Sequence, residues 1–150
     1  MKIVIRTFLC AIVFAACFAQ AENKYKPYGE VTEMVNEYTA SWAIADSGKR
    51  LAKVQKFFAE GGVYVDPIIQ QNGGDQIQGT KALNTAMAEF QKQFPKATIK
   101  VRNIHQSGDY ITWSWKLKSS IGKISGQNYA ELDKDGKISR LISFMGLLQK

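Results

Sequence analysis

The chain has 150 residues, a formal net charge of +7 and 45% hydrophobic residues, which together indicate one globular domain with a proper core. Its Lys and Arg residues are scattered without a stripe interleaved with aromatic residues, so we expect a solvated basic face rather than an anionic partner site, and no nucleic-acid partner. His105 is the only histidine and both cysteines lie in the first 17 residues, so we expect no metal site, no cofactor and no disulfide.

The N-terminus has the features of a secretory signal peptide. Lys2 and Arg6 flank a start that runs into an apolar stretch over residues 7–18, and Ala19-Gln20-Ala21 provides the small residues of a cleavage site. We therefore predict a signal peptide over 1–21 and one domain over 22–150, in a secreted or periplasmic protein. No later segment approaches the length of a membrane-spanning helix, so no integral membrane segment is expected after cleavage.

Three helices are predicted in the first two thirds of the domain. Apolar residues at helical spacing indicate an amphipathic helix over about residues 30–45 and a second, shorter helix that ends at Gly61-Gly62. A third helix is expected from about Thr80, which can cap it, to Phe94, where Pro95 stops it.

The stretch GGVYVDP, residues 61–67, predicts a strand that ends at an aspartate. Val63, Tyr64 and Val65 favour a strand, and Pro67 has no N–H for continued pairing, so the strand should stop near Asp66. An aspartate before proline commonly opens a turn with its carboxylate in water. The alternative is a carboxylate that points into the fold and has a function.

From Ala97 onward the hydrophobic period changes to two. Apolar residues alternate with polar ones around 99–102 and 111–118, and Gly- and Asp-containing turns separate the segments. About four long strands therefore follow the helices, and helices segregated to one side of an antiparallel sheet make an α+β fold.

Three polar residues stand among apolar ones. Tyr38 lies on the apolar stripe of the first helix, Asp66 ends the first strand, and Asn128 shares its strand face with Ala130 and Leu132. Each has a structural explanation when taken singly: a core tyrosine, a turn residue, and a strand residue that bonds the backbone.

Several strings resemble the SnoaL-like group of the NTF2-like superfamily, which includes polyketide cyclases and ketosteroid isomerases. They cover nearly all of the predicted mature chain and read NEYTASWAIAD, GGVYVDP, IQGTKALNTAMAEF and GQNYAELDKDGKISRLISF. The resemblance implies three helices packed on a strongly curved, mostly antiparallel sheet that forms a cone with an apolar pocket.

The resemblance to the ketosteroid isomerases implies a set of catalytic residues. Their general-base aspartate sits in an Asp-Pro at the end of the first strand, which corresponds to Asp66. Their oxyanion tyrosine lies on the first helix eight residues before an aspartate, a spacing that Tyr38 and Asp46 reproduce. Asn128 stands where those enzymes have a protonated aspartate, and this departure replaces an acid with an amide that donates without a raised pKa.

The function implied is an exported SnoaL-like protein that binds a small apolar ligand, with Asp66 as the base of an isomerase-type or cyclase-type proton transfer. The alternative is a non-catalytic ligand-binding or accessory protein of the cell envelope. The residues expected to contact the ligand are Trp42, Tyr64, His105, Trp113, Trp115 and Phe144. The last strand, Ile138 to Met145, is apolar on both faces, so a second buried surface such as a homodimer is also expected.

The first prediction concerns processing of the N-terminus. We expect the exported protein to begin at Glu22, because Ala19 and Ala21 satisfy the small-residue requirement of cleavage. A weak lipobox that ends at Cys17 leaves a lipoprotein as the second route. Intact-mass measurement separates the two, since a lipidated chain starting at Cys17 would contradict cleavage after Ala21.

Overall fold

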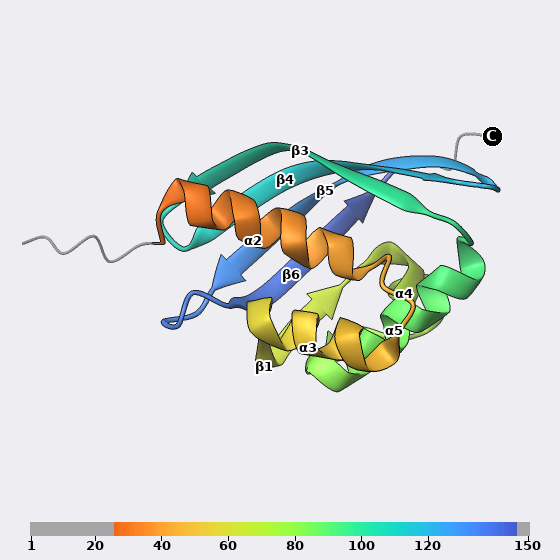
Figure 1. Ribbon diagram of the computed structural model, residues 1–150, viewed down its shortest axis with the longest axis horizontal. Coiled ribbons are helices and arrows are strands. Elements are labelled where there is room, and N and C mark those ends of the chain that lie inside the picture. Colours follow the sequence, from red (N-terminus) through yellow and green to blue (C-terminus); the bar gives the residue numbers. More distant parts are fainter. Residues whose placement is uncertain (1–25, 147–150) are drawn as a thin grey trace, which may run out of the picture.

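The computed structural model describes residues 26–146 and shows helices packed on one side of a curved sheet (Figure 1). The predicted signal peptide, its cleavage site after Ala21 and the lipobox cysteine Cys17 lie outside the described residues. Within residues 26–146, no helix combines the length and the apolar character needed to cross a bilayer. In chain order the elements are α2 (Tyr28–Ser41), α3 (Ser47–Phe57), β1 (Phe58–Val65), α4 (Pro67–Gln71), β2 (Ile77–Gln78), α5 (Thr80–Gln93), β3 (Thr98–Ser107), β4 (Tyr110–Ser119), β5 (Gly122–Leu132) and β6 (Ile138–Met145).

The six strands form one open, mixed sheet in the order β2-β1-β6-β5-β4-β3. All neighbouring pairs are antiparallel except β1 and β6, which are parallel. Helix α2 contacts β3, whereas α3 and α5 contact each other and β1, so the helices cover one face of the sheet, as Figure 1 shows. This face is called the inner face below, and the opposite one the outer face. The predicted α+β class is confirmed.

The core lies between the inner face and α2. The apolar stripe of α2 is fully buried, and the inner-face residues of β4 and β6 that it meets are buried as well. With residues of β1 and α5 included, the largest buried side chains of the core are Trp113, Tyr38, Phe58, Met34, Leu83, Met87, Ile111, Ile138 and Leu141. The apolar residues that repeat every 3.6 positions along the helix therefore pack on the apolar residues that alternate along the strands, and together they form one buried layer.

The second helix ends earlier than the sequence predicted. It stops at Phe57, and β1 begins at Phe58, so Gly61 and Gly62 lie inside the strand rather than at the end of the helix. The pairing of β1 with β6 shifts register between Phe58 and Val63, which is a bulge. A Cβ at Gly62 would overlap the Phe58 ring, so this glycine marks a close approach within a strand.

A buried arginine that the sequence did not reveal joins the helices. Arg50 on α3 is 2% exposed, and its Nε donates to Asn84 Oδ1 on α5 at 2.7 Å. Its Nη1 donates to the Ile44 carbonyl in the α2–α3 connection at 2.7 Å. A buried charge is tolerated only when it is hydrogen-bonded, so these contacts hold the connection and both helices in place.

Gly126 on β5 makes room for the Trp115 ring. The two residues are direct cross-strand partners, and a Cβ at Gly126 would overlap both the Trp115 ring and the Phe144 carbonyl oxygen. The glycine thus lets an indole lie flat against the inner face of the sheet, close to β6.

We expect Gly126→Ala to lower the free energy of unfolding by about 3 kcal/mol, because the ring and a backbone carbonyl must both shift. Gly61→Ala is the matched control within β1, since nothing lies within 4 Å of its Cβ position. That control should change stability by about 0.5 kcal/mol or less. Urea denaturation followed by circular dichroism measures both, and equal effects would contradict the close approach at Gly126.

Candidate functional site

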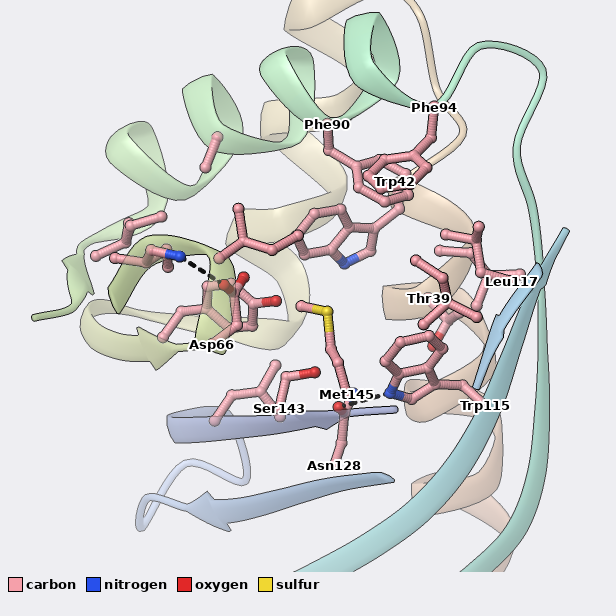
Figure 2. A pocket seen from close by; sticks show the side chains of 18 of the residues that line it. Thr39, Trp42, Asp66, Phe90, Phe94, Trp115, Leu117, Asn128, Ser143 and Met145 are labelled. Atoms are coloured by element: carbon pink, nitrogen blue, oxygen red, sulfur yellow. Dashed lines mark hydrogen bonds between the residues drawn. The ribbon is translucent and has the colours of Figure 1, made fainter. Parts of the chain in front are cut away.

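A cavity of about 390 Å³ lies between the inner face and the helices. One wall is aromatic: Trp42, the C-cap residue of α2, packs edge-on against Phe90 on α5 with ring centroids 5.1 Å apart, and the Phe94 ring lies 5.0 Å from that of Phe90. Figure 2 shows these rings above the pocket and the strands of the sheet below it. The volume lies within the range of small-molecule sites, about 300–1,000 Å³.

A row of residues with polar groups crosses β4, β5 and β6 beside the pocket and continues to Asp66, directly after β1. Asn128 on β5 pairs directly with Trp113 on β4 and with Ser143 on β6. Val65 pairs with Ile142, which places the next residue, Asp66, beside Ser143. All four residues of the row line the cavity, and Figure 2 shows Asp66, Ser143 and Asn128 at its base.

Asp66 both begins a helix and lies inside the fold, so its position has a feature of each alternative that the sequence left open. Its Oδ1 accepts a hydrogen bond from the backbone N–H of Ile69 at 2.9 Å, so it is the N-cap of the short helix α4, with Pro67 at the first helical position. The residue is nevertheless only 7% exposed and lines the pocket. One carboxylate oxygen is therefore held by the cap, and the hydroxyl of the buried Tyr64 lies close to the carboxylate.

Two buried tyrosines accompany this carboxylate. Burial raises the pKa of Tyr64 well above its ordinary value, and the negative charge of Asp66 raises it further. Burial also raises the pKa of Tyr38; the nearby Trp42 indole opposes this rise, while the charge of Asp66 adds to it. Both hydroxyls therefore stay protonated at neutral pH and can donate hydrogen bonds.

The Tyr38 hydroxyl is buried without a hydrogen-bond partner among the described residues. The residue is 1% exposed, its ring stacks on Phe58 with centroids 6.2 Å apart, and it borders the cavity. Trp113 Nε1, in the polar row, is unpartnered in the same way. Buried donors without partners are rare in folded proteins, so these two are candidates for contact with a bound molecule.

The amide of Asn128 has a defined orientation. Trp115 Nε1 donates to Asn128 Oδ1 at 2.9 Å, a contact drawn in Figure 2. An indole nitrogen can only donate, so the amide oxygen must face it and the amide NH₂ must point elsewhere. Within the described chain Nδ2 makes no hydrogen bond, which leaves it free to donate to an acceptor in the pocket.

The structure gathers most of the residues singled out from the sequence. Tyr38, Asp66 and Asn128, far apart in the chain, line one cavity. The expected aromatic contacts Trp42, Tyr64, Trp113 and Trp115 line it too. Asp46, which reproduced the isomerase spacing, is the exposed N-cap of α3 and lies outside the pocket.

His105 and Phe144 do not line the pocket, contrary to expectation. A bulge between Arg102 and His105 on β3 puts His105 opposite Thr112, so it is exposed on the outer face. Phe144 is 56% exposed, because the alternation of β6 sends Ser143 and Met145 inward instead.

The pocket residues that the sequence reasoning missed include Ser143, Phe90 and Phe94. Ser143 is 5% exposed and lies between Leu141 and Met145 on one apolar strand face, so a polar residue at that period-two position was the available signal. The two phenylalanines are spaced four apart, Phe90 on α5 and Phe94 at its C-cap, a pattern that a purely structural helix face shares.

Comparisons with known proteins identify the fold. No protein-family model matches the sequence, and neither does any curated protein. A proposed isomerase of the SnoaL-like family from Agrobacterium tumefaciens superposes with a TM-score of 0.68 at 23% identity, over 77% of this chain and 97% of the other. A proposed SnoaL-like polyketide cyclase from Jannaschia sp. CCS1 gives 0.62 at 15% identity, over 76% and 83%. TerC, co-crystallised with polyporic acid, gives 0.63 at 12% identity, over 77% and 90%. The chain therefore has the SnoaL-like, NTF2-like fold, which hosts many functions.

Replacement of Tyr38 by phenylalanine should stabilise the protein. The change removes a buried hydroxyl that has no partner, so we expect the free energy of unfolding to rise by about 1–2 kcal/mol. Tyr129→Phe is the control, because the Tyr129 hydroxyl donates to Glu131 Oε1 at 3.1 Å and its loss should bring no gain. Urea denaturation compares the variants. A loss of stability in Tyr38→Phe would show that the hydroxyl is satisfied within the protein.

Proposed function

We propose that this SnoaL-like chain binds a small, mostly apolar molecule in the pocket and catalyses a proton transfer at it, with Asp66 as the base. The observation that carries the proposal is a carboxylate, 7% exposed, in the wall of a largely apolar cavity that also holds unpartnered donors. Bases in catalytic sites are found in such partly desolvated surroundings.

The chemistry follows from what each group can do. The oxygen of Asp66 that does not cap α4 takes a proton from a carbon next to a carbonyl, and the electrons of that C–H bond move toward the carbonyl oxygen. The hydroxyl of Tyr38 and the NH₂ of Asn128 are the donors available for the resulting enolate. In an isomerisation, Asp66 then returns the proton to another carbon of the ligand. In a ring closure, the enolate carbon instead forms a bond to a second carbonyl carbon of the ligand, and the proton from Asp66 goes to the oxygen of that carbonyl. The base is regenerated in both cases.

The remaining pocket residues restrict how such a ligand lies. The aromatic wall of Trp42, Phe90 and Phe94 covers an apolar ring system and keeps water from the carboxylate. Trp115 keeps the Asn128 amide turned so that it donates rather than accepts. Similarity to TerC, which was co-crystallised with polyporic acid, supports a small organic molecule as the ligand of this chain.

Asp66→Asn tests the base. We expect turnover to fall about a hundredfold or more, since an amide cannot accept the proton, while Asn keeps the N-cap of α4. The assay is exchange of deuterium from heavy water into the α-carbon of a panel of aromatic and alicyclic ketones, together with ultraviolet detection of conjugated product from β,γ-unsaturated ketones.

Asp46→Asn is the matched control for this experiment. It also replaces the aspartate at the N-cap of a helix, with Lys49 N donating at 2.7 Å, but lies outside the pocket. It should leave turnover unchanged. Equal losses in both variants would mean that Asp66 acts only through the helix cap.

A non-catalytic ligand-binding or accessory protein of the cell envelope is the second candidate. It is favoured by the use of one Asp66 oxygen as a structural cap. In that case the wild-type protein gives no exchange with any ketone, and Asp66→Asn changes ligand affinity only modestly and stabilises the fold, because a buried charge is removed. The N-terminal sequence supports export for both candidates. A homodimer through β6 also stays a proposal, supported by the exposed Phe144 on its outer face.

A further inference from the structure

The sheet register gathers cations that look scattered in the sequence. On the outer face, Lys100 of β3 lies directly opposite Lys116 of β4, and Lys118 of β4 lies opposite Lys123 of β5. Arg102 follows Lys100 two residues along β3 and so shares its face. All five are exposed, and their inward neighbours Ile99, Trp115, Leu117 and Ile124 line the pocket. These five residues, Lys100, Arg102, Lys116, Lys118 and Lys123, are called the basic patch.

The basic patch has no compensating acid. None of its side chains takes part in an ion pair or hydrogen bond within residues 26–146. Their direct cross-strand partners other than each other are Thr98, Ser114 and Ser125, all neutral. Like charges placed directly opposite each other destabilise a sheet. The two facing lysine pairs therefore lower stability, and an anionic surface would remove this repulsion.

An exposed apolar residue extends the patch at its end. Ile121 is 49% exposed in the tight turn between Ser119 and Gly122, which joins β4 to β5 next to Lys118 and Lys123. In Figure 1 the ends of these long strands project beyond β6. Cations beside a protruding apolar side chain fit a bilayer surface, where headgroups carry negative charge and the acyl boundary lies just below.

We propose that the basic patch docks this protein on the anionic headgroups of a phospholipid bilayer, with Ile121 inserted at the acyl boundary. A second copy that presents its own basic patch is a poor occupant, because it would bring five more cations to the same contact. A single-stranded nucleic acid is also a poor occupant, because the neutral residues among the cations include no aromatic ring on which a base could stack. The pocket lies on the inner face of the sheet and the basic patch on the outer face, so the docking proposal stands apart from the proton-transfer proposal.

The test is cosedimentation of the protein, purified after export, with vesicles of phosphatidylcholine alone or with about 30% phosphatidylglycerol. We expect binding only to the anionic vesicles, and its loss when salt is raised from about 50 to about 500 mM. Lys116→Gln combined with Lys118→Gln should weaken binding about tenfold or more, because each cation near an anionic surface adds to the attraction.

Lys49→Gln combined with Lys81→Gln is the matched control. It removes the same charge from exposed positions on α3 and α5, the helices of the inner face, and should weaken binding less than about threefold. Ile121→Ser should weaken binding to the anionic vesicles without changing its dependence on salt. The melting temperature of the Lys116 and Lys118 double variant should be unchanged or higher, which separates lost docking from lost folding.

Three results would overturn the proposal. The first is equal weakening by the patch and control pairs, which would mean that only overall charge matters. The second is equal binding to neutral vesicles. The third is binding to a single-stranded oligonucleotide without binding to anionic vesicles, which would assign the basic patch to nucleic acid instead.

Discussion

The register of β4, β5 and β6 is the constraint on which the pocket depends. It aligns Trp113, Asn128 and Ser143 in one row on the inner face, and the parallel pairing of β1 with β6 continues the row to Asp66. Because side chains alternate between faces, a slip of one residue would turn this whole row to solvent. The absent side chain of Gly126 helps to hold the register, since only there can Trp115 lie against the sheet and reach the Asn128 amide.

The short helix α4 resolves a conflict between stability and chemistry at Asp66. A buried carboxylate without partners would be costly, and one with all its acceptor positions filled could not act on a ligand. The hydrogen bond by which one oxygen caps α4 lowers the free-energy cost of burying the carboxylate, and it also fixes the direction of the second oxygen. Tyr38 differs, because its hydroxyl has no hydrogen-bond partner within the described chain. The desolvation of this hydroxyl on folding is therefore not offset by a hydrogen bond.

Sequence patterns predicted those parts of the fold that depend on local periodicity. The first and third helices, the strand ending at Asp66 and the α+β class follow from spacing and from residues such as Pro95. Sequence reasoning failed where tertiary contacts decide. Gly62 looks like a helix stop but lies in a bulge under the Phe58 ring, and the bulge before His105 turns that residue outward. Cross-strand register, which unites Ser143 with Asn128 and Lys100 with Lys116, is not encoded in any single strand.

The same alternation that builds the pocket also builds the basic patch on the other side of the sheet. Between Lys116 and Lys118, Leu117 points into the cavity, so each strand carries an apolar inner face and a cationic outer face. The outer positions need only be polar to keep the sheet soluble, and pairs of opposite charge there would add stability. Lysines that face each other across two strands instead lower the stability of the sheet. The requirements of the fold therefore do not account for the facing lysines beside Ile121, whereas the proposed docking on an anionic surface does.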